Sequence, residues 1–275
     1  MLYRAILLAA FSGLLSWPCI SQANDDTLTF GIVPQQSAKK LAASWQPLLT
    51  YLSDKTGVTI VFSTAKDIPT FEARLASKQY DIAYMNPYHY TEFHDLVGYQ
   101  ALARQKNKSI VGVIIVPVDS EITRVEDLHG LTMAFPAPAA FAASILPQAE
   151  LARMGISVTP QYVFSHDSVY LNVSKGFLPA GGGIIRTLNS TEPALRNNLK
   201  VLWESRAYTP HAIATAQRLD PAIRAALLDA LLALSVTEDS TILAPLKFDG
   251  FEKADNADWD DVRALGIQSL ARPHF

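Results

Sequence analysis

The first third of the chain alternates between two hydrophobic periods. Residues 27–33 (TLTFGIV) are rich in β-branched and aromatic side chains and stop before Pro34, which predicts a strand. Residues 37–57 predict a helix with Ser37 as N-cap and Gly57 at its end, because apolar residues recur at steps of three and four: Leu41, Trp45, Leu48, Leu49 and Leu52. A strand at 58–64, a helix at 68–79 and a short strand at 80–85 follow. This alternation favours parallel βαβ units.

The pattern restarts in the middle of the chain. Strand candidates lie at 109–117, 131–135, 160–164, 180–185 and 198–205, and a helix at 220–234 has Asp220 as N-cap. Two strand-like segments, 110–117 and 199–213, bracket the middle block. We therefore expect two α/β lobes between which the chain crosses twice: residues 24–112 plus 208–275 form lobe one, and residues 113–207 form lobe two. Ligands of such sheets bind beyond the carboxyl ends of the strands, here between the lobes.

The N-terminus has the pattern of a cleaved signal peptide, residues 1–23. Met1–Arg4 carries one positive charge, the apolar run AILLAAFSGLLSW follows, and SQA supplies small residues before Asn24. A membrane anchor is the alternative, but the run is short for a bilayer. The residues before Cys19 do not form a lipobox. The mature chain then has no cysteine, which excludes disulfides and cysteine-based metal sites or nucleophiles.

Charge and motifs narrow the function further. The formal net charge is −3, and ARQKNK (103–108) is interpreted as a solvated loop, so no nucleic-acid partner is expected. We expect a secreted, soluble globular protein that is not membrane-embedded. No GxSxG, HExxH, Walker or GxGxxG motif occurs, which argues against an enzyme and against a cofactor. His89 and His94 are five residues apart, a poor spacing for a helical metal pair, and no metal is expected.

Three segments carry candidate binding residues. In YMNPYHY (84–90), Tyr84, Asn86 and Tyr88 follow a strand, although any of these rings can equally pack in the core. His166 and Asp167 lack a nucleophile; His166 donating to an anion and a helix cap at Asp167 or Ser168 both stay open. The glycines of AGGGIIR (180–186) would let backbone approach a ligand or a neighbouring strand.

PAPAAFAAS (136–144) follows a strand and opens a helix. The first N–H groups of a helix are unpaired and attract anions, yet this segment offers no side-chain donor before Ser144. Backbone N–H groups at 139–143 would therefore hold an oxyanion, while Ala140 and Phe141 narrow and dry the pocket.

Four segments together resemble the PhnD-like phosphonate/phosphite-binding proteins of periplasmic ABC importers: residues 30–60, LASKQYDIAYMNPYHY, DSEITRVEDLHGLTMAFPAP and SHDSVYLNVSKG. The resemblance runs in order from about residue 28 to 245. It implies a type II periplasmic binding fold, two α/β lobes closing on a ligand. It also implies an oxyanion site at Gln35, the Tyr84–Tyr88 region, His166 and Ala139–Ala143, with the family's acidic residue at Pro179.

Two departures from the family pattern concern the ligand. The Ser/Thr loop is AAFAA here, and each lost hydroxyl bond to a charged oxygen is worth roughly 1.5–3 kcal/mol. Proline replaces the acid at 179, while Arg186 offers positive charge unless it is a surface residue. The predicted function is capture of a small oxyanion, phosphonate-like or divergent, for an ABC permease. The alternative is a periplasmic subunit that presents its ligand to a membrane sensor kinase. The predicted ligand-binding residues are Gln35, Tyr84, Asn86, Tyr88, Ala140, Phe141, His166 and Arg186.

Overall fold

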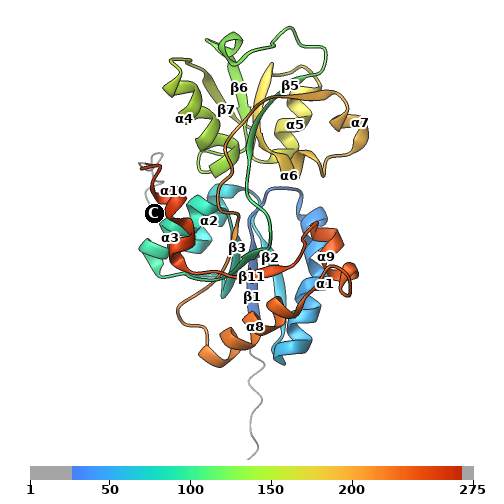
Figure 1. The fold of residues 1–275 in the computed structure, drawn as a ribbon, viewed down its shortest axis with the longest axis vertical. Coiled ribbons are helices and arrows are strands. Elements are labelled where there is room, and N and C mark those ends of the chain that lie inside the picture. The colour runs from blue at the N-terminus through green and yellow to red at the C-terminus, as the bar shows by residue number, and fades with distance from the viewer. Residues whose placement is uncertain (1–26, 268–275) are drawn as a thin grey trace, which may run out of the picture.

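The protein forms two sheets, stacked end to end with helices around each (Figure 1). The computed structural model describes residues 27–267, so the predicted signal peptide lies outside the described residues. We call the six-stranded sheet with its helices lobe one and the five-stranded sheet with its helices lobe two. The sheet of lobe one has the order β11-β4-β10-β3-β1-β2, and that of lobe two β7-β6-β8-β5-β9.

Lobe one is built from two separate parts of the chain. Its strands are β1 (Leu28–Ile32), β2 (Ile60–Thr64), β3 (Ile82–Met85), β4 (Gln100–Gln105), β10 (Ala212–Thr215) and β11 (Phe251–Lys253). Its helices are α1 (Ala38–Thr56), α2 (Ile68–Ala76), α3 (Pro87–Val97), α8 (Pro221–Ala233), α9 (Ser240–Leu243) and α10 (Asp260–Arg263), with short 3₁₀ turns at Ala244–Leu246 and Asn256–Trp259.

Lobe two comes from the chain between these parts. Its strands are β5 (Gly112–Pro117), β6 (Thr132–Phe135), β7 (Thr159–Tyr162), β8 (Ala180–Ile184) and β9 (Leu199–Glu204). Its helices are α4 (Leu146–Arg153), α5 (His166–Ser174), α6 (Ile185–Leu188) and α7 (Pro193–Arg196), with a 3₁₀ turn at Val125–Leu128 and a π-helical turn at Phe141–Ile145.

The predicted helix boundaries follow from local caps. Ser37 accepts a hydrogen bond from the N–H of Lys40 at the start of α1, and Gly57 ends the helix with a φ of 71°. The carboxylate of Asp220 accepts from the N–H groups of Ala222 and Ile223 at the start of α8. The apolar stripe of α1 is buried as the periodicity predicts.

The strand directions bring the functional edges of the two sheets together. β1 pairs in parallel with β2 and β3, and β6 pairs in parallel with β7 and β8, which confirms the predicted parallel units. The segments that follow β1, β3, β6 and β7 line one pocket between the lobes. The carboxyl ends of these parallel strands therefore face each other across the lobe boundary.

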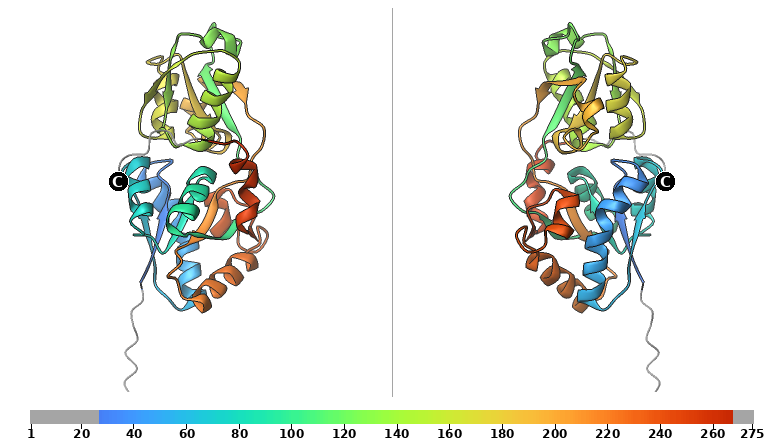
Figure 2. Two further views of the ribbon diagram at one scale, coloured as in Figure 1. Left: turned by 90° about the vertical axis from the view of Figure 1, so that its left-hand side faces the viewer. Right: turned by 90° about the vertical axis from the view of Figure 1, so that its right-hand side faces the viewer.

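The chain crosses between the lobes twice, after β4 and after β9. The two crossing segments run along the same side of the molecule (Figure 2) and meet at Ile110 and Tyr208, whose N–H and C=O groups bond to each other at 2.9 and 3.1 Å. The expected strand over 199–213 is broken into β9 and β10, because β9 pairs in the sheet of lobe two and β10 in the sheet of lobe one. The residue boundaries of the lobes stay a prediction.

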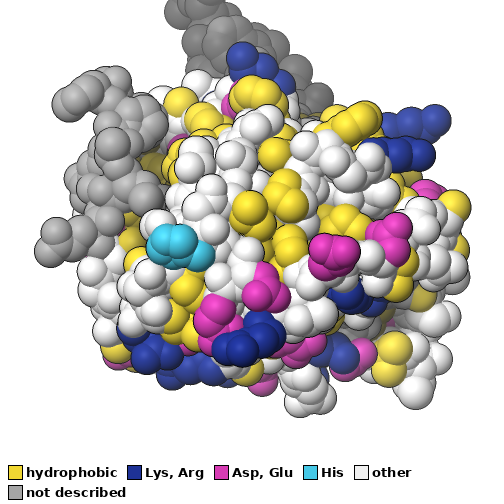
Figure 3. Space-filling model, turned by 90° about the horizontal axis from the view of Figure 1, so that it is seen from above, with side chains coloured by type: hydrophobic (Ala, Val, Ile, Leu, Met, Phe, Trp, Pro, Cys, Tyr) yellow, Lys and Arg dark blue, Asp and Glu magenta, His cyan; other side chains and the backbone are white. Residues whose placement is uncertain are grey.

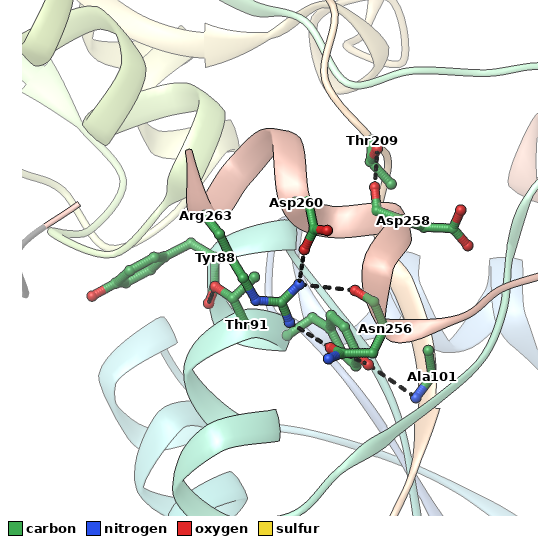
Figure 4. A network of polar contacts seen from close by, with 9 residues as sticks. Tyr88, Thr91, Ala101, Thr209, Asn256, Asp258, Asp260 and Arg263 are labelled. Atoms are coloured by element: carbon green, nitrogen blue, oxygen red, sulfur yellow. Dashed lines mark hydrogen bonds and ion pairs between the residues drawn. The ribbon is translucent and has the colours of Figure 1, made fainter. Parts of the chain in front are cut away.

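The C-terminal part of lobe one holds the second crossing segment in place. The hydroxyl of Thr209 donates to the carbonyl of Asp258, and the indole N–H of Trp259 donates to the carbonyl of Pro210 at 2.9 Å. Arg263 donates to Asn256 and Asp260 and closes this turn on itself (Figure 4). The crossing is therefore anchored at its lobe-one end.

Residues 103–108 differ from their predicted form. Ala103 to Gln105 belong to strand β4, with Ala103 fully buried, so the segment is not simply a solvated loop. Two of its three cations are paired with acids: Arg104 lies 3.4 Å from Glu252 and Lys108 lies 2.9 Å from Asp249. Charged side chains on the outer positions concealed the alternation typical of a strand.

The outer end of lobe two shows charges of both signs side by side (Figure 3). Within this lobe, Arg124 lies 3.2 Å from Glu126 and Arg153 lies 2.6 Å from Glu150. No helix among residues 27–267 has the length and apolar character needed to cross a bilayer.

Candidate ligand-binding site between the lobes

A small pocket lies where the strand ends of the two lobes meet, and we call it the histidine pocket. Lobe one and the crossings contribute Val33, Gln35, Ile68, Asn86, Ile110 and His211; lobe two contributes Ala140, Phe141, Ala142, Ala143, His166 and Ile184. Its volume is about 10 Å³, room for about one water molecule. In this conformation the walls are packed together, and a group larger than water enters only if they move.

The loop after β6 supplies backbone donors to this pocket. Among residues 27–267, the N–H groups of Phe141, Ala142 and Ala143 bond to no protein acceptor, whereas the N–H of Ala140 donates to the carbonyl of Ala137. The expected row of free N–H groups at 139–143 is therefore interrupted at Ala140. Three donors at the start of a helical segment suit an oxyanion.

Glycines in two strands seat this loop on the sheet of lobe two. A Cβ on Gly112 would lie 2.1 Å from the carbonyl oxygen of Ala142, and a Cβ on Gly182 would lie 1.9 Å from that of Ala143. The interpretation that the glycines allow close approach is correct, but what approaches is the helical turn after β6 and not a strand. In a regular helix the carbonyl of Ala143 would accept from the N–H of residue 147, but Pro147 has no N–H. This carbonyl therefore lacks its regular helical donor at the point where it packs on Gly182.

His166 opens α5 at the floor of the histidine pocket. Its ring is buried, its Nδ1 has no hydrogen-bond partner, and burial together with the charge of Arg186 lowers its pKa to about 3. The ring is therefore neutral, and its Nδ1 is a buried polar atom without a partner among residues 27–267. Ser165 caps α5 by accepting from the N–H of Ser168, so the alternative of a cap at Asp167 or Ser168 is wrong.

Gln35 joins the lobes through two hydrogen bonds whose donors and acceptors can be assigned. Arg186 can only donate, so the 2.5 Å contact from its Nη2 sets the oxygen of Gln35 toward lobe two. The amide Nε2 of Gln35 then donates to Nε2 of His211 at 2.9 Å. His211 is buried and stacks on Tyr84 at 4.9 Å, and burial followed by the charge of Arg186 lowers its pKa well below 6.5.

His211 was missed by the sequence analysis. It directly precedes β10, and β10 runs antiparallel to β3. The residue before an antiparallel strand lies at the same edge of the sheet as the residues that follow its neighbour β3. A histidine between Pro210 and the apolar run AIAT was the available signal.

The predicted site residues fall into three groups. Gln35, Asn86, Ala140, Phe141 and His166 line the histidine pocket. Tyr84 and Arg186 line a second pocket of about 130 Å³, which also touches Gln35. Tyr88, in α3, lines neither of these pockets, and its side chain points away from the Arg263 network (Figure 4).

Asn86 has structural roles besides lining the pocket, and Pro179 lies elsewhere than the resemblance implies. Asn86 caps α3 by accepting from the N–H of His89 and donates across the lobes to the carbonyl of Ala139 at 3.1 Å. Pro179 precedes β8, which runs toward the pocket, so it lies at the opposite end of the strand. Arg186, just past the carboxyl end of β8, is the residue that reaches the lobe boundary.

The two other histidines singled out in the sequence have protein partners. Nε2 of His89 lies 2.9 Å from Oε1 of Glu72, and Nδ1 of His94 lies 2.8 Å from the carbonyl oxygen of Tyr99. No group of three His, Cys, Asp or Glu side chains placed to hold a metal occurs in residues 27–267.

Two α/β lobes with paired crossings and a pocket at the facing strand ends define a type II periplasmic binding fold. A sequence model of the periplasmic substrate-binding proteins of phosphonate ABC transporters matches residues 30–259. The chain belongs to this family. Its members are substrate-binding components and not enzymes, as the sequence predicted.

Three proteins illustrate the similarity. The phosphate-import protein PhnD of Mycolicibacterium smegmatis is 22% identical, over 88% of this chain and 80% of that protein. A binding protein component of an ABC phosphonate transporter from Pseudomonas aeruginosa has a TM-score of 0.80, with 20% identity over 87% of this chain and 85% of that one. PhnD1 from Prochlorococcus marinus, in complex with methylphosphonate, also has a TM-score of 0.80, with 16% identity over 88% and 98% of the two chains. The sensor-subunit alternative is not favoured by these matches.

Proposed function

We propose that the protein captures a small phosphonate-type oxyanion in the periplasm and delivers it to an ABC permease, after export by a cleaved signal peptide. The observation that carries this proposal is the set of unpaired polar groups at one point of the lobe boundary. The N–H groups of Phe141, Ala142 and Ala143 and the Nδ1 of His166 have no protein partner among residues 27–267, and all four residues line the histidine pocket.

These groups suit an anion better than a neutral ligand. Backbone N–H groups can only donate, and His166 donates from Nδ1 when that nitrogen carries its single proton. Arg186 supplies positive charge beside the pocket, since its field adds to burial in lowering the pKa of both pocket histidines. The three similar proteins named above are a phosphate-import protein, a phosphonate-transporter component and a protein in complex with methylphosphonate, which supports the same ligand class.

The small pocket volume adds a condition to the proposal. A phosphonate group is larger than one water molecule, so the lobes must separate or the Phe141 ring must turn before it enters. Phe141 is buried and packs edge-on against Tyr208 of the second crossing at 5.4 Å. Binding is therefore coupled to movement at the crossings.

A panel of oxyanions tests the proposal. Phosphite, methylphosphonate, phosphate, sulfite, thiosulfate, arsenite and short carboxylates are added to the mature chain, and the melting temperature is recorded. A ligand at a hundredfold excess over its dissociation constant stabilises the folded state by about 2.7 kcal/mol. We expect phosphonates or phosphite to give the largest shift and His166→Ala to abolish it. The proposal would be contradicted if carboxylates gave the largest shift in melting temperature, or if none of the oxyanions gave a shift.

A further inference from the structure

A second cavity adjoins the histidine pocket at Gln35, and its lining has a different charge. We call it the cation pocket. It has a volume of about 130 Å³, and its lining includes Lys40 from α1, Arg186 from α6, and Lys247 from the turn before β11. No acidic residue is part of that lining. Three positive charges therefore surround one cavity.

The charges of the cation pocket are not neutralised by ion pairs. Lys40 donates to the carbonyl of Ser190 at 2.9 Å and Lys247 to the carbonyl of Asn189 at 3.1 Å, both across the lobe boundary. Among residues 27–267, none of Lys40, Arg186 and Lys247 lies within 4.0 Å of a carboxylate. An ammonium group has three donors, so each lysine retains donors beyond its carbonyl bond.

Two further side chains, Gln36 and Asp167, affect which ligand the cation pocket can hold. Nε2 of Gln36, in the same lining, is buried and has no hydrogen-bond partner. Asp167 of α5 is the acid whose charge interacts with Lys40, but it does not belong to the lining. The buried Gln36 donor without a partner favours a hydrogen-bond acceptor in the cavity. The three cations are exposed or half-exposed, and together they favour an occupant that carries negative charge.

We infer that the ligand carries two anionic groups, a phosphonate in the histidine pocket and a second anion, such as a carboxylate, in the cation pocket. This inference rests on the proposed function and specifies its ligand. Gln35 lines both pockets, so the two groups are joined by a short spacer that passes its side chain. A ligand with an amine in place of the second anion meets three cations and is rejected.

Calorimetric titration with three phosphonates tests the inference. The probes are methylphosphonate with one anionic group, phosphonoacetate with two, and 2-aminoethylphosphonate with a cationic tail. We expect phosphonoacetate to bind at least tenfold tighter than methylphosphonate, and 2-aminoethylphosphonate to bind most weakly. Because the preference comes from charge, it should shrink as NaCl is raised. Phosphonoformate and 3-phosphonopropionate then report the preferred spacer.

Matched variants separate charge from lobe contact. Lys40→Gln and Lys247→Gln remove a charge but keep a side-chain donor, so each should weaken phosphonoacetate about tenfold and leave methylphosphonate within twofold. Lys39→Gln, one residue away on the exposed side of α1, is the control and should change neither. An equal loss for both ligands would mean that the lysines only hold the lobes together, which overturns the inference.

The outcomes also separate this inference from the proposed function. If methylphosphonate binds and phosphonoacetate binds no tighter, the two-anion inference fails and the proposed function stands. If none of these phosphonates binds to the folded chain, both fail.

Discussion

The histidine pocket and the cation pocket meet at one side chain yet differ in almost every physical property. The first has a volume of about 10 Å³ and two buried histidines whose pKa values are lowered, so it is tight and neutral. The second has about 130 Å³ and three cations. Gln35 separates them, with its oxygen held by Arg186 and its amide by His211. We therefore expect shape to select the ligand in the histidine pocket and charge to select it in the cation pocket.

Acid should damage the histidine pocket and leave the cation pocket charged. The folded-state pKa of His166 is about 3 and that of His211 is also below 6.5, so the unfolded chain binds more protons between these values and 6.5. The free energy of unfolding therefore falls as the pH drops below 6.5, by at most about 1.4 kcal/mol per pH unit for each histidine. Between pH 7.5 and 5 the two together account for up to about 4 kcal/mol. Urea unfolding at three pH values measures this loss.

A control variant assigns the acid effect to the pocket. His166→Gln should remove about half of the pH dependence, whereas His129→Gln, at an exposed position of lobe two, should leave it unchanged. A stability that stays flat between pH 7.5 and 5 would mean that these histidines are not neutral in the folded state.

Replacing a glycine by alanine should disrupt the histidine pocket and leave the cation pocket intact. Gly182→Ala places a methyl group 1.9 Å from the carbonyl oxygen of Ala143, which is backbone and cannot turn aside. We expect a loss of about 2–3 kcal/mol in the free energy of unfolding, as for overpacked cores. The displaced loop should also lose methylphosphonate binding. Ala152→Ser, on the exposed side of α4, is the control. If folded Gly182→Ala still binds methylphosphonate normally, the loop after β6 is not part of the binding site.

The strands, helices and helix ends follow largely from sequence periodicity, whereas the contacts that build the two pockets do not. The alternation of strands and helices predicted the parallel units, and Ser37, Gly57 and Asp220 predicted helix ends, because those signals are local. The pairing of Gln35 with Arg186 joins residues 151 positions apart, which periodicity cannot relate. Nor can spacing show that Pro179 lies at the far end of β8.

Removing the shared charge should weaken both pockets. Arg186→Met eliminates the cation nearest to Gln35, and a hydrogen bond to a charged group is worth about 1.5–3 kcal/mol. We expect at least a tenfold loss for methylphosphonate and for phosphonoacetate alike, measured by calorimetry. The pKa values of His166 and His211 should rise while staying below 6.5, because burial remains their larger cause. Nuclear magnetic resonance titration of the rings would show this, and unchanged pKa values would contradict the electrostatic link.

A single hydroxyl added to the histidine pocket should change methylphosphonate affinity by the smallest amount of these variants. Ala142 lines it with an N–H that has no protein acceptor among residues 27–267, and the volume of about 10 Å³ leaves room for one oxygen atom. Ala142→Ser should therefore strengthen methylphosphonate binding by about 1 kcal/mol, since we expect the new hydroxyl to donate to the anion together with the unpaired N–H groups. The cation pocket is untouched, so the ratio of phosphonoacetate to methylphosphonate affinity should stay the same. Ala152→Ser again serves as the control. If Ala142→Ser weakens methylphosphonate, the hydroxyl competes with the anion for space, and the phosphonate group must sit closer to Phe141 than to Ala142.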